Sequence, residues 1–238
     1  MRILVIGAGM YVTGRGSTGV GTILAALAQF SKHSKIDLVD VVARNPENRL
    51  RVEASVASIN KAIGSELKCN YFTPDSLGTF IDDSDPYDAA IIVVPDNLHY
   101  DIGKTVLGKG IHCLIAKPFT PTVAEALNLI AIQREKKIYG AIEFHKRFDE
   151  SNLLVKKLID DGSVGEVKFF CVNYSQRISM PLEVFGAWAS NTNVFQYLGC
   201  HYVDLIYFFT GAIPKTVTAI GTRGLLSSSG LCTYDSVH

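Results

Sequence analysis

The chain has 238 residues, 47% hydrophobic and 19% charged, which suffices for one large or two small folded domains. Its 23 basic and 23 acidic side chains balance, which argues against a nucleic acid or an acidic membrane surface as partner. No apolar run reaches about 18 residues and no signal-peptide pattern opens the chain, so we expect neither a transmembrane helix nor a secretory leader. The 5 cysteines are widely spaced and form no C-x-x-C pair, so we expect free thiols, no metal site and a cytoplasmic location.

The N-terminal stretch MRILVIGAGM combines a strand pattern with a glycine turn. Residues 3–6 are apolar without alternation, which is typical of a parallel strand covered on both faces. Gly7 and Gly9 follow directly, and glycines at this place let the backbone turn sharply and a phosphate approach closely. We therefore expect a dinucleotide-binding first βα unit, with Gly7, Gly9, Met10 and Tyr11 at the cofactor.

The glycine fingerprint G-x-G-x-x-G is incomplete in this chain. Val12 stands at its third glycine position, and Gly14 comes two residues later. The segment from Tyr11 to Gly21 holds four further glycines before a helix-like run begins at Thr22, so we expect an enlarged turn. The alternative interpretation is a glycine-rich surface loop without a ligand.

The end of the second expected strand, 36–44, bears on the choice of cofactor. An acidic residue at this place normally binds the ribose 2′-hydroxyl of NAD, whereas the chain has Arg44 there. A guanidinium can hold a 2′-phosphate in a bidentate fork, so Arg44 favours NADP over NAD; the alternative is a solvent-facing arginine. Asp40 lies within the strand, too early for the ribose role.

Strands and helices alternate up to about residue 145. Helix-like patterns over 22–30, 46–65, 75–81, 100–107 and 124–136 separate strand-like runs over 36–44, 71–72, 89–94, 111–116 and 138–144. This order predicts a doubly wound parallel sheet, whose ligands bind at the carboxyl ends of the strands. The polar residues Arg44, Asn97, His99, Lys117 and His145 all fall at or just after such ends, and we assign Pro95, Asn97 and His99 to the cofactor.

One helix start stays open between two registers. Pro121 suits a first helical position, whereas Thr122 with Glu125 forms a possible capping box.

The pattern changes after about residue 145. Helices are expected over 151–160 and 197–209, and strands over 165–175, 215–223 and 234–238. We therefore expect a Rossmann domain over 1–145 and an α+β domain over 146–238.

Five short motifs occur in order along the chain: Gly7-Ala8-Gly9, Pro95-Asp96-Asn97-Leu98-His99, Ala116-Lys117-Pro118-Phe119-Thr120, Lys146-Arg147-Phe148-Asp149 and Gly199-Cys200-His201-Tyr202-Val203-Asp204. Together they resemble the Gfo/Idh/MocA oxidoreductases, most of which are sugar and polyol dehydrogenases. The resemblance implies a nicotinamide cofactor and a second domain with a large, open antiparallel sheet, often used to form homo-oligomers. It makes Lys117 the catalytic lysine and His201 the acid–base histidine.

Three positions depart from the family pattern. Ala116 replaces the glutamate of the E-K-P motif, Tyr197 replaces an aspartate four residues before the histidine, and an asparagine is replaced around His145. The chain is also shorter than the usual member, so the resemblance implies a C-terminal part that is short or incomplete.

Oxidation of an alcohol requires a base for the hydroxyl proton. We expect His201 to be that base, oriented by Asp204 on the same helix face, with Tyr197 as a possible relay and Lys117 orienting the hydroxyl. His145 and Arg147 are assigned to the substrate.

The expected function is an NAD(P)-dependent oxidoreductase acting on a CH–OH group of a sugar, sugar derivative or polyol. Two alternatives stay open. One is a nucleotide-binding sensor or assembly subunit without dehydrogenase activity. The other is a family member whose cofactor serves a reaction with no net redox change.

Overall fold

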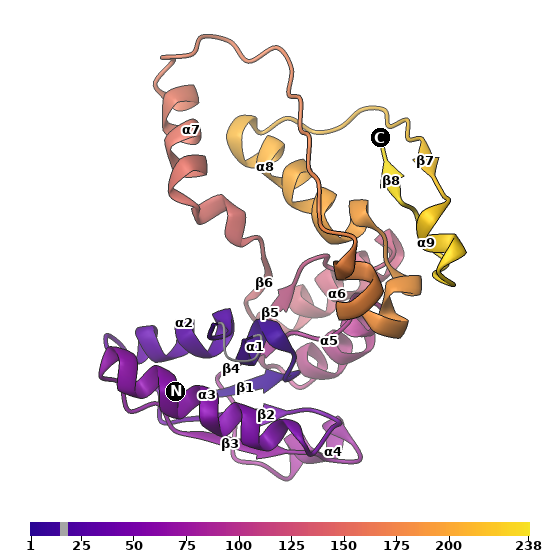
Figure 1. Cartoon of the computed structure of the whole chain (residues 1–238). Helices are drawn as coiled ribbons and strands as arrows, with labels where there is room; N and C mark the ends of the chain where they lie inside the picture. The colour runs from indigo at the N-terminus through magenta and orange to yellow at the C-terminus, as the bar shows by residue number, and fades with distance from the viewer. Residues whose placement is uncertain (15–18) are drawn as a thin grey trace. The chain divides into compact units, whose positions relative to one another are not determined.

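The computed structural model describes residues 1–14 and 19–238, which form two compact units, Met1–Ile142 and Glu143–His238 (Figure 1). The middle of the enlarged turn expected after the first strand, residues 15–18, lies outside the described residues. Within the described chain, no helix combines the length and apolar character needed to cross a membrane.

A six-stranded sheet forms the centre of the first unit, in the order β3-β2-β1-β4-β5-β6. Its strands are β1 (Arg2–Ile6), β2 (Leu38–Val42), β3 (Cys69–Phe72), β4 (Ala89–Ile92), β5 (His112–Ala116) and β6 (Gly140–Glu143). The pairs β1–β2, β2–β3, β1–β4 and β4–β5 are parallel, with Ile3 opposite both Val39 and Ala89. The strand order reverses at β1, where ligands bind in such sheets. This confirms the predicted doubly wound parallel sheet.

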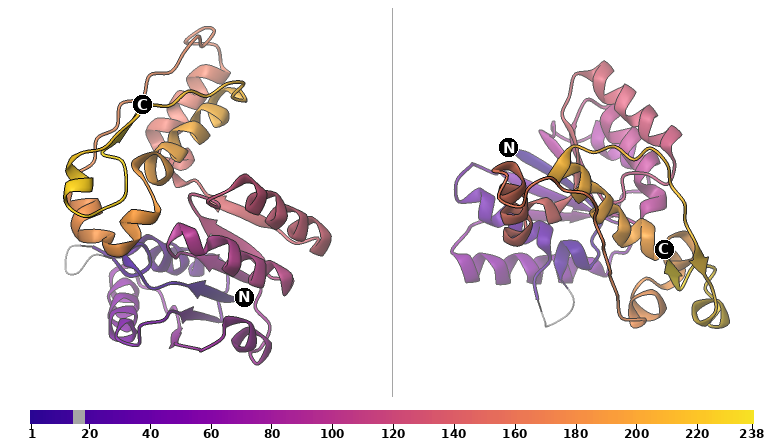
Figure 2. Two further views of the ribbon diagram at one scale, coloured as in Figure 1. Left: turned by 90° about the vertical axis from the view of Figure 1, so that its right-hand side faces the viewer. Right: turned by 90° about the horizontal axis from the view of Figure 1, so that it is seen from above.

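Helices cover both faces of this sheet, as Figure 2 shows. They are α1 (Met10–Thr13), α2 (Thr22–Ser31), α3 (Asn48–Ile63), α4 (Leu77–Asp82), η2 (Asp96–Leu98), α5 (His99–Gly108) and α6 (Val123–Lys136). Val5 packs in the hydrophobic cluster that includes α2 and α3, and its neighbour Leu4 packs in the cluster that includes α5 and α6. Successive strand side chains point to opposite faces, so an unbroken apolar run supplies both cores.

The start of α6 decides between the two registers. The Glu125 N–H donates to the Thr122 hydroxyl at 3.3 Å, and the Thr122 N–H donates to the Glu125 carboxylate at 3.0 Å. This is a complete capping box, so Thr122 caps the helix and Pro121 lies outside it.

The second unit is mainly helical, with one small antiparallel pair of strands. Its elements are η3 (His145–Phe148), α7 (Glu150–Asp160), η4 (Met180–Val184), η5 (Gly186–Asn191), η6 (Phe195–Gly199), α8 (Cys200–Thr210), β7 (Gly221–Thr222), α9 (Leu225–Ser228) and β8 (Ser236–Val237). Helix α7 packs against α8. The β7–β8 pair confirms an antiparallel sheet, although each strand has only two residues.

The strand expected over residues 165–175 is wrong, and those over 215–223 and 234–238 shrink to β7 and β8. In the described chain, no strand pairs with residues 165–175, so their alternation produces no ladder (Figure 1). Phe169 is accordingly 82% exposed.

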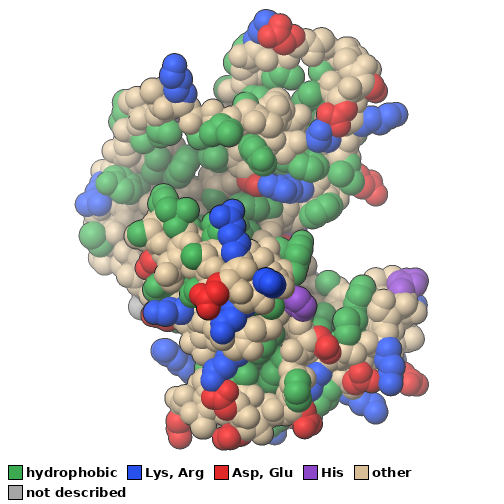
Figure 3. All heavy atoms as spheres, turned by 180° about the vertical axis from the view of Figure 1, so that it is seen from behind, with side chains coloured by type: hydrophobic (Ala, Val, Ile, Leu, Met, Phe, Trp, Pro, Cys, Tyr) green, Lys and Arg blue, Asp and Glu red, His purple; other side chains and the backbone are tan. Residues whose placement is uncertain are grey.

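On the face drawn in Figure 3, hydrophobic side chains lie among charges of both signs.

Candidate cofactor and active site

Gly7 is required by the backbone of the turn after β1. Its φ is +111°, and a Cβ built there would lie 2.0 Å from the carbonyl oxygen of Val93. The Gly7 N–H donates to the Val42 carbonyl at 2.8 Å. The turn is thus held between the ends of β2 and β4, where no side chain fits.

Gly9 is different, because the fold itself makes no demand for glycine there. Its φ is −71°, and a Cβ at this position would meet no atom of the described residues within 4 Å. Gly9 is the N-cap residue of α1, and its carbonyl accepts from the Val12 and Thr13 N–H groups. The open space beside Gly9 fits the close approach of a phosphate to the backbone.

Gly21 allows the close helix packing for which the fingerprint normally uses its third glycine. A Cβ on Gly21 would lie 2.1 Å from the Val12 carbonyl oxygen, so the start of α2 lies directly against α1. Met10 and Tyr11 on α1 are half-buried, and Tyr11 packs against the core that contains α2 and α3.

Arg44 is exposed, two residues beyond the end of β2. Across residues 1–14 and 19–238, no side chain forms an ion pair or hydrogen bond with its guanidinium. Asp40, by contrast, is fully buried and accepts from Arg2, Asn70 and Tyr87. Asp40 is therefore engaged inside the fold, and its exclusion from the ribose role stays a prediction.

His99 is fully buried, which changes its assigned role. Its Nδ1 lies 2.7 Å from the Pro118 carbonyl oxygen, and its Nε2 lies 3.0 Å from that of Val94. The ring therefore links the end of β4 to the segment after β5. The expectation of direct cofactor contact is corrected, because the ring has no exposed surface to offer a ligand.

Three other predicted residues lie at the carboxyl ends of β4 and β5. Pro95 and Asn97 are exposed after β4, and Asn97 follows a buried Asp96 that accepts its N–H at 2.9 Å. Lys117 is half-buried and directly follows β5. Lys117 belongs to the first unit and His201 to the second, so their joint action stays a prediction.

His201 lies in the first turn of α8 and is 2% exposed. Its ring contacts the ring of His145 edge to face, with centroids 4.6 Å apart, and that of Phe144 at 6.2 Å. Gly199, the residue before α8, leaves room for the Phe195 ring. A Cβ built at Gly199 would lie 2.6 Å from that ring. The fold thus brings His201 and His145 together, which the sequence spacing alone did not predict.

Asp204 does not play its expected role toward His201. Its carboxylate binds Arg147 instead, with Arg147 Nε donating to Oδ2 at 2.7 Å and Nη2 donating to Oδ1. The same bond engages Nε and Nη2 of Arg147, and the assignment of Arg147 to the substrate stays a prediction.

Glu143 is the residue that sequence reasoning missed. A carboxylate oxygen of Glu143 lies 2.9 Å from Nδ1 of His145. The signal was the spacing: residues i and i+2 share a side of an extended chain, and β6 ends at Glu143.

Tyr197 packs in an aromatic cluster within the second unit. Its ring centroid lies 4.7 Å from that of Phe185 and 5.8 Å from that of Trp188. Its assignment as a proton relay stays a prediction.

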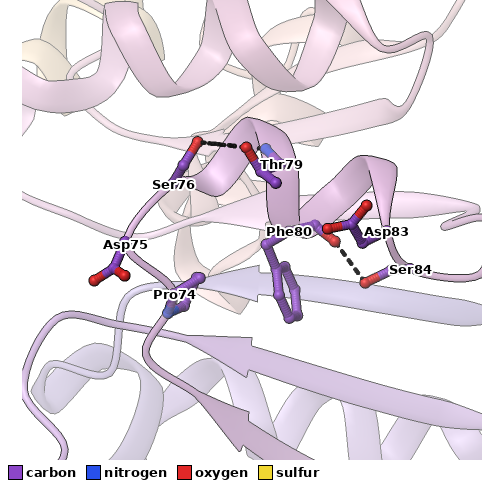
Figure 4. A pocket seen from close by; sticks show the side chains of 7 residues that line it. All are labelled: Pro74, Asp75, Ser76, Thr79, Phe80, Asp83 and Ser84. Carbon is purple, nitrogen blue, oxygen red and sulfur yellow. Dashed lines mark hydrogen bonds between the residues drawn. The ribbon is translucent and has the colours of Figure 1, made fainter.

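A shallow hollow of about 570 Å³ lies against α4 and the residues on either side of it (Figure 4). It is lined by Pro74, Asp75, Ser76, Thr79, Phe80, Asp83 and Ser84. Among these described residues none is basic, and two are carboxylates, so the hollow does not suit a phosphate group. Throughout the described chain, no cluster of His, Cys, Asp or Glu could hold a metal ion.

Comparison with known proteins assigns both units. An oxidoreductase family with an NAD-binding Rossmann fold matches residues 1–143, and the GFO/IDH/MocA C-terminal domain matches residues 152–229. The chain belongs to the GFO/IDH/MocA oxidoreductase family.

Relatives of this family share part of the chain. The scyllo-inositol 2-dehydrogenase (NADP(+)) of Bacillus subtilis is 30% identical over 133 residues, which cover 54% of this chain and 36% of the relative. The UDP-N-acetylglucosamine 3-dehydrogenase of Acidithiobacillus ferrooxidans is 28% identical over 172 residues, 72% of this chain and 50% of the relative. The chain thus matches half or less of the length of these two curated relatives.

A solved structure shows the same fold. A putative myo-inositol dehydrogenase from Sinorhizobium meliloti 1021 superposes with a TM-score of 0.67 at 22% identity. The match covers 99% of this chain and 63% of that chain.

Proposed function

We propose that this GFO/IDH/MocA chain is an NAD(P)-dependent oxidoreductase acting on a CH–OH group of a sugar, sugar derivative or polyol. The observation that carries the proposal is the buried imidazole of His201 in contact with the second imidazole of His145, since alcohol oxidation requires a base. The dehydrogenases among its relatives act on inositol and on a nucleotide sugar, which supports this substrate class.

The residues after β1 and β2 fit a nicotinamide dinucleotide. The backbone around Gly9 and the N-terminal residues of α1, Met10 and Tyr11, form its pyrophosphate side, and Gly7 shapes the turn. The exposed guanidinium of Arg44, two residues after β2, supports pairing with a 2′-phosphate and hence a preference for NADP over NAD. When bound, the nicotinamide ring supplies the hydride acceptor or donor.

Each catalytic role follows from side-chain chemistry. His201 takes the proton of the substrate hydroxyl, and the Lys117 ammonium orients that hydroxyl and stabilises its developing negative charge. Tyr197 stands on the turn before α8, as a possible relay.

The direct test is turnover by the purified chain with a panel of inositols, sugars and polyols and either cofactor, followed by the absorbance of reduced nicotinamide. Lys117→Ala is expected to lower kcat at least about tenfold while cofactor affinity stays within about twofold. Unchanged turnover in this variant would remove Lys117 from the mechanism.

A second candidate is a cofactor-binding protein without dehydrogenase activity. Ala116 and Tyr197 favour it, because each replaces a carboxylate of the family pattern. Saturable cofactor binding without turnover of any panel member would support this candidate.

Self-association and a cytoplasmic location complete the proposal. Phe169 and Val172 expose apolar surface in the unpaired segment of the second unit, which suits contact with another copy. Sedimentation velocity of the purified chain measures this association.

A further inference from the structure

Glu143, His145 and His201 form a continuous array within the second unit. The Glu143 carboxylate contacts Nδ1 of His145 at 2.9 Å, and the His145 ring contacts the His201 ring at a centroid distance of 4.6 Å. The two histidines differ in exposure: His201 is 2% exposed, whereas the His145 side chain is 39% exposed. A buried base thus lies against a second imidazole that reaches solvent.

Two charged side chains of η3, close to the array in sequence, are paired with carboxylates of the same unit. Arg147 on η3 is paired with Asp204 on α8, and Lys146 lies 3.9 Å from Asp149. Glu143 therefore supplies the negative charge beside His145, and its side chain is only 14% exposed, which limits screening by solvent.

We propose that Glu143 and His145 form an orienting arm beside His201. Glu143 accepts the Nδ1–H of His145 and fixes the tautomer, which leaves Nε2 of His145 free of a proton in the neutral ring. The His145 ring lies edge to face against the His201 ring, at a centroid distance of 4.6 Å, so its orientation fixes the position of the base that receives the substrate proton. The Glu143 carboxylate beside His145 also stabilises the positive charge that His201 gains with that proton, as a carboxylate does for a catalytic histidine.

The role of the arm in catalysis rests on the proposed function, whereas the contacts of Glu143 with His145 and of His145 with His201 do not. At Tyr197 the chain has a phenol in place of the family's carboxylate, and Asp204 is bound to Arg147. The array gives His201 a carboxylate through His145, a route specific to these residues.

The first test measures the tautomer in the full-length chain labelled with ¹⁵N-histidine. Ring nitrogen shifts of neutral His145 are expected to show the proton on Nδ1. Glu143→Met removes the acceptor and is expected to shift most of the population to the Nε2–H form. Glu166→Gln is the matched control, because Glu166 belongs to the same unit and forms an exposed pair with Lys168. A wild-type His145 protonated on Nε2, or an unchanged tautomer in Glu143→Met, overturns the inference.

The second test measures kcat and KM. Glu143→Gln keeps an acceptor for Nδ1–H but removes the charge, so kcat is expected to fall about 10-fold to 100-fold with KM within about twofold. A kcat equal to that of Glu166→Gln refutes the arm. If the wild-type chain turns over no substrate, the proposed function fails, and the tautomer measurement still decides whether Glu143 orients His145.

Discussion

Arg147 holds Asp204 by two hydrogen bonds, with Nε donating to Oδ2 at 2.7 Å and Nη2 donating to Oδ1. The bond joins η3 to α8, and the guanidinium also lies over the rings of Phe144 and Phe208, at 5.6 and 5.4 Å. The Asp204 carboxylate accepts hydrogen bonds from Arg147 and raises the pKa of its guanidinium. The pair therefore fixes the segment that carries His145 against the helix that carries His201.

Replacing Arg147 with Met should destabilise the chain. The change leaves the Asp204 carboxylate, whose side chain is only 9% exposed, without its cation, at a cost of about 2 kcal/mol in unfolding free energy. Lys168→Met is the control, since Lys168 pairs with Glu166 at an exposed position and should cost less than about 0.5 kcal/mol. Urea unfolding of both variants measures the difference, and equal midpoints would show that the fork contributes nothing.

His99 should matter to stability through the backbone it holds. His99→Gln cannot reach the Val94 and Pro118 carbonyls at once, so we expect a loss of about 2 kcal/mol in unfolding free energy. His33→Gln, at an exposed position, should leave the unfolding free energy within about 0.5 kcal/mol. A His99 variant as stable as the control would contradict the clamp between β4 and the segment after β5.

The same residue predicts a pH dependence. Burial lowers the pKa of His99 below its usual 6.5, although its bonds to the Pro118 and Val94 carbonyls oppose the shift. Between the folded-state pKa and 6.5 the unfolded chain binds more protons, so this contribution is present above pH 6.5 and is lost as the pH falls through the folded-state value. Unfolding midpoints at stepped pH should therefore fall less steeply on the acid side in His99→Gln than in wild type. If the unfolding midpoints of the two proteins fell equally steeply toward acid pH, the contribution of His99 to the pH dependence would be refuted.

Gly7 and Gly9 should respond to substitution in opposite ways. Gly7→Ala forces a Cβ against the Val93 carbonyl and a side chain into positive φ, and should cost about 3 kcal/mol or more in unfolding free energy. At Gly9 a Cβ meets no described residue within 4 Å, so Gly9→Val should leave the unfolding free energy within about 1 kcal/mol. Its side chain fills the space expected for phosphate, and NADPH affinity should fall at least about tenfold. A Gly9→Val variant that binds NADPH normally would place the phosphates elsewhere.

Arg44 should set the choice between cofactors. Arg44→Gln removes a charge-assisted bond to a 2′-phosphate, so the Kd for NADPH should rise about 10-fold to 100-fold while that for NADH changes little. Arg51→Gln, an exposed arginine on α3, serves as the control. Equal effects on both cofactors would dismiss the 2′-phosphate contact.

The sheet of the first unit was predictable because its signals are local. Runs such as residues 3–6 and 89–94 are apolar without interruption, and each is followed by a turn or a helix pattern. Since parallel strands all end at one edge, the positions of Arg44, Asn97 and Lys117 at that edge followed directly.

The second unit exposed the limit of such signals. The alternation over residues 165–175 is a strand pattern, yet a strand requires a partner backbone, which no local sequence specifies. Likewise, Asp204 stands three residues after His201 on one helix, but Arg147, 57 positions before it, binds the carboxylate. Glu143 was missed because its role depends on the contact between His145 and His201, which are 56 positions apart within the second unit.

The nicotinamide site is tested most directly by a fluorescence titration of the purified chain with NADPH and with NADH. We expect saturable binding of both cofactors, tighter for NADPH. No saturable change with either cofactor would contradict the assignment of a nicotinamide site to the glycine turn after β1.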